Sequence, residues 1–247
     1  MIPPKTPRQA ALAARSALRR IARAHAIDYS HYLRAHGPFV FLNTGTAPMR
    51  AIAVSIYREQ RSGWTLREAL EFATILMADR CFEFKAVGIE VLARFERQFT
   101  PSLLPVLKRW LADGLAANWA TTDSLCGALL GPLIVRHLAL ADRLGAWTRH
   151  RSLWVRRASV VGLIASARKG QALDRLYDNA ERLHGDGHDL IQKAVGWSLR
   201  EAGKTDMPRL ERYLRDHGAS IPRTTVRYAI ERFPDAKRRA LLIATRA

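Results

Sequence analysis

The sequence contains few cysteines and no long apolar run. Its two cysteines, Cys81 and Cys126, lie inside apolar helical patterns, and their spacing matches neither a disulfide framework nor a zinc site. We therefore expect two buried thiols, no bound metal and a reducing compartment. No apolar stretch approaches the roughly 20 residues that a bilayer-spanning helix needs, so we expect no membrane-spanning helix.

Acidic residues are also scarce. The chain has 22 Asp and Glu against 40 Lys and Arg, which gives a formal net charge of +18. So large an excess of one charge makes a compact chain repel itself, and a polyanionic partner such as nucleic acid or an anionic membrane surface explains it best. A genome that favours arginine would explain Arg over Lys, but explains the shortage of acids less well.

The alternation of apolar and polar residues that is typical of β-strands is almost absent. Apolar residues recur at spacings of three and four, which predicts amphipathic helices, and Gly and Pro divide the chain into segments of about one helix each. Helix starts are predicted at Thr65, which opens a capping box; at Thr100-Pro101, with Pro at the first helical position; and at Asp206 with Pro208. Paired helices over the whole length predict an all-α solenoid whose concave face carries the basic charge.

No low-complexity linker divides the chain, so residues 1–247 are predicted to form a single domain. The Ala- and Arg-rich first 26 residues lack the apolar core of a secretory signal. Their composition also fits an organelle transit peptide, but an amphipathic helix with Leu12, Leu18 and Ile21 in its apolar stripe is the simpler interpretation. The least helical segment, Gly37 to Pro48, is expected to be an ordered loop near the ligand.

Three short clusters hold the residues best suited to chemistry. Trp119 and Asp123 are four positions apart, so a helix would place them on one face. The second cluster runs from Leu153 to Ser159, just after His150-Arg151, and the third from Ile191 to Glu201.

Each cluster also fits a purely structural role. Tryptophans at helical spacing are commonly core aromatics, and Asp123 suits a helix N-cap ahead of Ser124. The remaining basic residues fit the solvated faces of amphipathic helices: Arg156, Arg157, Lys193 and Arg200.

Taken together, in this order and spacing, the clusters resemble the AlkD family of alkylpurine DNA glycosylases. That family has a Trp followed four residues later by Asp, then a Trp-x-x-Arg-Ala segment, and last a Gln-Lys-Ala-(Ile/Val)-Gly-Trp-x-Leu-Arg-Glu helix. The matching residues here are Trp119 with Asp123, Trp154 through Arg157-Ala158, and Gln192 through Glu201. The resemblance runs from about Tyr32 to Phe233, and its third block is the most specific.

The resemblance implies an all-α fold of HEAT-like repeats that holds double-stranded DNA in a basic concave groove. It implies excision of cationic alkylated purines such as 3-methyladenine and 7-methylguanine, leaving an abasic site, with no cofactor and without a base-recognition pocket. The functional residues of the family correspond to Trp119, Asp123, Arg157 and Trp197. We expect further DNA-backbone contacts from Arg149, Arg151, Lys193 and Arg200, and a monomer in a bacterial cytoplasm, associated with the nucleoid when on DNA.

The chemistry of the substrate explains these residue types. A purine alkylated at N3 or N7 is already a cation and a good leaving group, so the remaining task is to stabilise the positive sugar and supply water. We expect the Asp123 carboxylate to do both. Trp119 and Trp197 would flank the deoxyribose with their electron-rich faces, and Arg157 would grip a phosphate with its planar fork.

The sequence departs from the family at three places. Asn118 stands where members often have an aromatic residue, Asp189 and Leu190 precede the third block where members can carry aromatics, and the segment from Gly37 to Pro48 differs. These differences bear on the size of the adduct accepted, and bulky adducts of DNA-alkylating natural products are one alternative substrate. A catalytically silent DNA-binding relative and a protein-interaction scaffold are the alternative functions. The complete residue set argues against the first, and the net charge against the second.

Overall fold

The computed structural model describes residues 4–24 and 27–246 of the chain. Within these ranges the regular structure is helical, with an isolated β-bridge between Val40 and Cys81, so the all-α prediction is confirmed. The chain forms two compact units, which divide between Leu129 and Leu130 and are called unit 1 and unit 2 below. That residues 1–247 act as one domain stays a prediction, and residues 1–3, 25–26 and 247 lie outside the described part.

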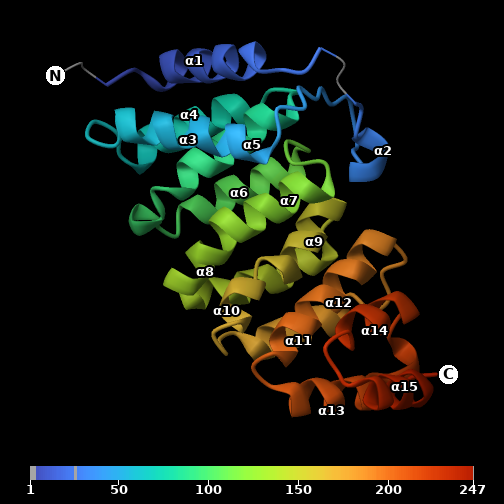
Figure 1. The fold of residues 1–247 in the computed structure, drawn as a ribbon. Coiled ribbons are helices and arrows are strands. Elements are labelled where there is room, and N and C mark those ends of the chain that lie inside the picture. Colours follow the sequence, from blue (N-terminus) through green and yellow to red (C-terminus); the bar gives the residue numbers. More distant parts are fainter. Residues whose placement is uncertain (1–3, 25–26, 247) are drawn as a thin grey trace. The chain divides into compact units, whose positions relative to one another are not determined.

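Unit 1 is built from seven helices and a short 3-10 turn in the described residues, and a π-helical stretch runs across its boundary with unit 2. The elements are α1 (Pro7–Arg20), α2 (Ser30–Leu33), α3 (Thr46–Gln60), α4 (Leu66–Met77), α5 (Phe82–Ala93), η1 (Glu96–Gln98), α6 (Leu103–Ala112), α7 (Trp119–Leu125) and η2 (Cys126–Leu130). Helix α1 packs against α3, α4 and α5 (Figure 1). Phe72, Phe84 and Leu107 lie fully buried in the core of unit 1.

Local capping signals explain where two of these helices begin. The Glu68 carboxylate accepts the Thr65 backbone N–H at 2.8 Å, as a capping box requires. The Glu68 carboxylate also accepts a hydrogen bond from the Thr65 hydroxyl. Chiefly this bond, and then the one from the Thr65 backbone, lowers the pKa of Glu68 to about 2. The predicted start at Thr100-Pro101 is wrong, because α6 begins at Leu103. There the Thr100 hydroxyl pairs with the Ser102 hydroxyl at 2.7 Å instead of capping a helix.

The amphipathic helix predicted in residues 1–26 is α1, although residues 1–3 and 25–26 of that range are not described. Its apolar stripe differs from the prediction. Leu18 is buried as expected, but Leu12 is 61% exposed and Ile21, at the C-cap, is 44% exposed. The buried face consists of small side chains instead, because α1 lies close on its neighbours: Ala10, Ala11 and Ala14.

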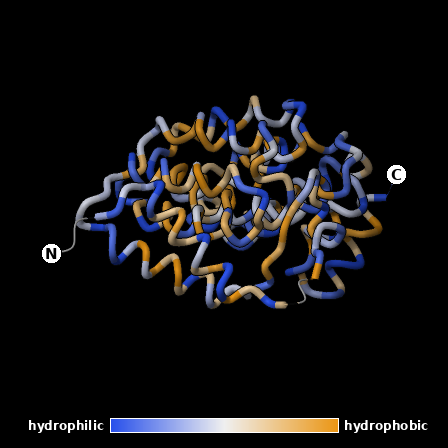
Figure 2. Tube along the Cα trace, turned by 90° about the horizontal axis from the view of Figure 1, so that it is seen from above, coloured by the Kyte–Doolittle hydropathy of each residue, from blue (hydrophilic) through white to orange (hydrophobic). Residues whose placement is uncertain are grey.

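Unit 2 continues with further short helices. The elements are α8 (Gly131–Arg136), a 3-10 stretch η3 (Leu138–Arg149), α9 (Leu153–Val161), α10 (Ile164–Ala167), α11 (Leu173–Arg182), α12 (Asp189–Gly203), α13 (Met207–His217), η4 (Gly218–Ser220), α14 (Arg223–Ala229) and α15 (Asp235–Ala244). The Asp206 carboxylate caps α13 by accepting the Arg209 backbone N–H at 2.9 Å, as predicted. Hydrophilic and hydrophobic stretches alternate along the helices (Figure 2), as amphipathic helices require.

Helix α12 is the central element of unit 2, because it packs against α9, α11, α13 and most extensively α14. Gly196 permits this last approach. A Cβ atom at Gly196 would lie 2.5 Å from the Tyr228 Cβ and 2.6 Å from the Thr225 carbonyl oxygen. Since no real side chain tolerates such distances, any residue other than glycine would push α14 away from α12.

Both cysteines are buried thiols, which confirms the burial predicted for them. Burial raises the pKa of the Cys81 thiol to about 12, so this thiol is unreactive at neutral pH. None of the helices in the described part of the chain combines the length and apolarity needed to cross a membrane.

Candidate active site

Trp119 and Asp123 lie on α7 in unit 1. The helix begins at Trp119 because the side chain of the preceding residue, Asn118, caps it: Oδ1 accepts the Thr121 backbone N–H at 2.8 Å. Asn118 is fully buried, and its amide also donates to the Thr121 hydroxyl at 2.8 Å. Asp123 therefore lies within the helix and is not its N-cap, so the capping alternative for Asp123 is wrong.

The indole of Trp119 is held by Tyr32. Its Nε1–H donates to the Tyr32 carbonyl oxygen at 3.0 Å, and the two rings meet edge to face with centroids 5.6 Å apart. Both Trp119 and Asp123 are partly exposed, on one face of α7, whereas Thr121 and Thr122 point into the core. The carboxylate is thus neither sealed in the interior nor fully solvated, and it stands one helical turn from an oriented indole.

The second cluster lies on α9 in unit 2. Trp154 is 3% exposed, which confirms the core role considered for it. Arg157 is 5% exposed, and its guanidinium donates to the Leu190 carbonyl oxygen in the first turn of α12 at 2.5 Å. Its neighbour Arg156 donates to the Asp186 carboxylate at 2.7 Å and to the His150 carbonyl oxygen at 3.0 Å. Both arginines therefore fix neighbouring segments, and their interpretation as a solvated face is wrong.

The third cluster follows the partly exposed side of α12. Trp197 comes directly after Gly196, at the close contact with α14, and is half-buried. Lys193 forms an ion pair with Asp189 one turn earlier, at 3.2 Å, and Arg200 forms an ion pair with Glu231, just past α14. Arg149 and Arg151 are exposed on either side of His150, where η3 ends.

Within each unit the structure thus brings specific predicted residues together. Unit 1 joins Trp119 to Asp123, and unit 2 joins Arg157 to the helix that carries Trp197. Sequence reasoning missed the capping role of Asn118, although an Asn before an apolar helical segment is itself a capping signal. It also missed Asp186 and Glu231, for which no local signal exists.

Within the described residues no cluster of three His, Cys, Asp or Glu side chains could hold a metal ion. The predicted functional residues are a carboxylate and an indole in unit 1, and an indole and basic side chains in unit 2. These groups stand on an all-helical repeat scaffold with a strongly positive chain.

The sequence, compared with models of known protein families, shows which family the chain belongs to. Residues 14–233 match the family model described as DNA alkylation repair enzyme, so the chain belongs to that family. No curated protein matches the sequence.

Solved structures share the fold at low sequence identity. A predicted DNA alkylation repair enzyme from Enterococcus faecalis is similar with a TM-score of 0.73 and 18% identity, covering 83% of this chain and 93% of that one. AlkD2 from Streptococcus mutans is similar with a TM-score of 0.60 and 12% identity, covering 92% and 98%. The smu.31 protein of Streptococcus mutans UA159 has a TM-score of 0.57 and 14% identity, covering 76% and 92%. The helical-repeat fold is therefore shared with proteins of this kind.

Proposed function

We propose that this protein is a monofunctional DNA glycosylase that hydrolyses the N-glycosidic bond of cationic alkylated purines in double-stranded DNA and leaves an abasic site. Membership of the DNA alkylation repair family and the net charge of +18 support the DNA substrate. The observation that carries the proposal is the partly exposed Asp123 carboxylate one turn from the anchored indole of Trp119.

In the proposed reaction the bond between the sugar C1′ and the purine nitrogen breaks, and the alkylated base leaves with the bonding electron pair. Because the base carries a positive charge beforehand, its departure needs no proton. The deoxyribose becomes positive as the bond lengthens, and the Asp123 carboxylate stabilises that charge. The same carboxylate orients a water molecule and takes its proton as the water oxygen bonds to C1′.

The two indoles have a supporting role in this proposal. Trp119 and Trp197 present aromatic faces to the deoxyribose, and an aromatic face attracts a nearby cation by about 0.5–2 kcal/mol. The hydrogen bond from Trp119 to the Tyr32 carbonyl oxygen fixes the orientation of one indole before substrate binds. A ring that is already oriented loses little side-chain entropy on binding.

The basic residues of unit 2 are the proposed contacts to the DNA backbone. Arg149 and Arg151 are exposed, and Lys193 and Arg200 are partly exposed, so all four can approach phosphates. Arg157 is proposed to contact a phosphate beside the lesion while its bond to the Leu190 carbonyl oxygen keeps the side chain in place.

The proposal also covers the setting in which the protein works. We propose a monomer in the bacterial cytoplasm, associated with the nucleoid when on DNA, that works without cofactor, metal or membrane. Elution volume in gel filtration with static light scattering tests the oligomeric state.

The Asp123→Asn variant tests the catalytic assignment, because it keeps the shape of the side chain and removes its charge. We expect release of 7-methylguanine from a duplex to fall to background while the dissociation constant for the same duplex changes less than about threefold. Unchanged release would refute the role of Asp123. If the wild-type protein binds the duplex but releases no base, the protein is the non-catalytic DNA-binding relative instead.

A further inference from the structure

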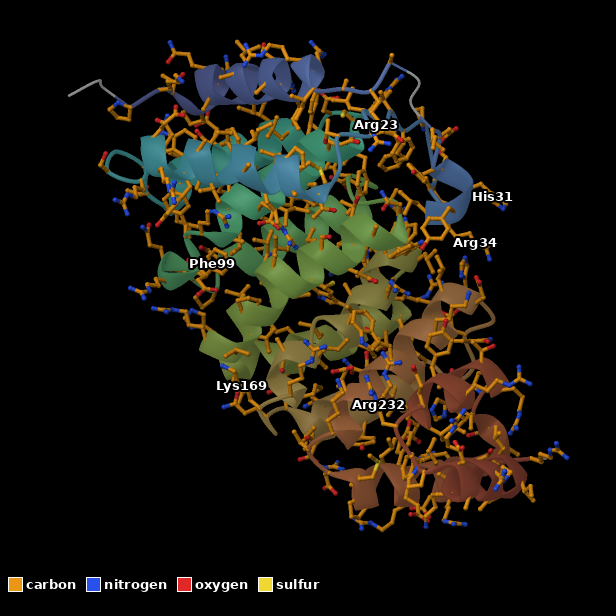
Figure 3. All side chains as sticks on the ribbon, viewed as in Figure 1. Arg23, His31, Arg34, Phe99, Lys169 and Arg232 are labelled. Atoms are coloured by element: carbon orange, nitrogen blue, oxygen red, sulfur yellow. The ribbon has the colours of Figure 1, made fainter. Side chains whose placement is uncertain are left out.

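Unit 1 contains a cavity that the proposed reaction does not use. It has a volume of about 270 Å³ and is walled by the rings of Tyr29, Tyr32, Phe41 and Phe82 together with Leu33 and Met49. We call it the aromatic pocket. Arg23 also lines it, and Figure 3 shows Arg23 near the end of α1, on the side of unit 1 where α2 carries His31.

The walls of the aromatic pocket are preformed. The Phe41 ring contacts Tyr29 edge to face at 5.9 Å and Phe82 at 5.8 Å between centroids. The buried Glu83 carboxylate, which also lines the pocket, accepts the backbone N–H of Leu42 at 3.0 Å and of Asn43 at 2.7 Å. These bonds hold the segment that carries Phe41. The loop predicted from Gly37 to Pro48 is confirmed up to Gly45, but the prediction is wrong for its last three residues, because α3 begins at Thr46.

The aromatic pocket is joined directly to the proposed catalytic helix. Tyr32 lines the pocket and at the same time contacts the Trp119 ring and accepts its Nε1–H. A second tether lies four residues further on, where the His36 backbone N–H donates to the Ala117 carbonyl oxygen at 2.8 Å. One aromatic side chain therefore separates the cavity from the indole that is proposed to meet the sugar.

We propose that the aromatic pocket binds the planar aromatic substituent of a bulky N3- or N7-alkylated purine while Trp119 contacts the deoxyribose of the same nucleotide. This inference rests on the proposed glycosylase function. Several aromatic rings with apolar neighbours favour a flat apolar ring, which they contact by stacking or edge to face. The volume lies near the lower end of the roughly 300–1,000 Å³ of small-molecule sites, which suits one or two fused rings. A methyl group leaves the pocket unoccupied.

The test compares two duplexes, one with 7-methylguanine and one with a guanine that carries a naphthylmethyl group at N7. Tyr29→Ala removes a wall whose side chain is 40% exposed, and Thr46→Trp fills the pocket from an exposed lining position. Tyr57→Ala is the matched control, since it removes a ring of the same unit that packs on Phe95, away from the pocket. Melting temperatures confirm that each variant is folded.

We expect both pocket variants to lower the rate of release of the naphthylmethyl base at least tenfold, which corresponds to about 1.4 kcal/mol or more in activation free energy. Methyl release should stay within about twofold of the wild-type rate. Tyr57→Ala should affect the two substrates equally. Equal losses on both substrates in the pocket variants, or no loss on either, would overturn the pocket assignment.

Equilibrium binding separates failure of the pocket from failure of the glycosylase function. We expect the wild-type protein to bind the naphthylmethyl duplex at least fivefold more tightly than the methyl duplex, and Tyr29→Ala to abolish this preference. If neither base is ever released, the proposed function fails, and the binding ratio alone decides the pocket. Equal affinity of the wild-type protein for both duplexes overturns the pocket in either case.

Discussion

The indole N–H of Trp119 donates to the main-chain carbonyl oxygen of Tyr32 at 3.0 Å, and the Tyr32 side chain then turns its ring edge to face against the same indole at 5.6 Å. One residue thus orients Trp119 twice, by its backbone and by its ring. Because Tyr32 lies 87 residues earlier in the chain, this pair ties the segment after α1 to α7.

This relationship predicts the effect of two substitutions at Trp119. Trp119→Phe keeps an aromatic face but loses the donor to Tyr32, whereas Trp119→Ala loses both. If the face contributes about 0.5–2 kcal/mol to a positive transition state, alanine lowers the single-turnover rate of 7-methylguanine release by roughly 2- to 30-fold, and phenylalanine by less. A rate for Trp119→Ala equal to wild type would remove the indole from the mechanism.

The cap at Asn118 predicts a coupled loss of stability and activity. Asn118→Ala removes the acceptor of the Thr121 N–H, which costs about 0.5–2 kcal/mol at a helix N-terminus and frays the turn that carries Trp119. We expect a fall in melting temperature of roughly 2–4 °C per kcal/mol for a chain of this size, together with slower base release. Asn118→Ser restores a short acceptor and should recover most of both. An alanine variant with wild-type activity would show that α7 does not need its cap.

Features of the fold that depend on local sequence signals were predictable, whereas those that depend on contacts between distant segments were not. The start of α4 at Thr65 and of α13 at Asp206 was predictable, because the hydrogen bonds involved join residues two or three positions apart. The exposure of Leu12 and the start of α6 were not predictable, because they depend on neighbouring helices and on competing turns. The helical-repeat class was predictable from the helical spacing of apolar residues and from the Gly and Pro residues that separate the helices, because both patterns run along the whole sequence.

The candidate site shows the same division. The spacing of Trp119 and Asp123 predicted their shared face, since helical geometry fixes it. The partners of Arg156 and Arg200 were not predictable, because Asp186 and Glu231 lie 30 and 31 residues away. The aromatic pocket was not predictable either, because its rings come from the N-cap residue of α2, from α2 itself, from the following loop and from α5.

A buried histidine in unit 2 predicts a pH dependence of stability. Burial, and then the neighbouring His217, lower the pKa of His184 to about 4, and the ring accepts or donates a hydrogen bond with the Tyr213 hydroxyl at 2.8 Å. Because the folded state binds this proton less readily than the unfolded state, the neutral ring contributes stability above pH 6.5 that is lost as the pH falls towards 4. The contribution is on the order of 3 kcal/mol.

His184→Gln, which is neutral throughout, should therefore flatten the fall in unfolding free energy between pH 6.5 and pH 4, measured by urea denaturation. His31→Gln, at an exposed histidine, is the control and should leave the slope unchanged. If the wild-type and His184→Gln proteins lose stability in parallel over this range, the ring is not held neutral by the fold.

The ion pair between Arg200 and Glu231 predicts that an acidic residue restrains DNA binding. Glu231 competes with phosphate for the Arg200 guanidinium, so Glu231→Gln should tighten binding to a plain duplex at low salt by up to about fivefold, as expected for a partly exposed pair.

Glu211→Gln is the matched control, because it removes one negative charge of the same unit from ion pairs with Arg215 and Lys237. A dissociation constant measured by fluorescence anisotropy that falls equally in both variants would show a general charge effect. If the dissociation constant falls only in Glu231→Gln, and the fall is abolished by adding Arg200→Ala, the effect belongs to the Arg200–Glu231 pair. In the Arg200→Ala variant alone, the slope of log K against log salt should shrink by roughly 0.9.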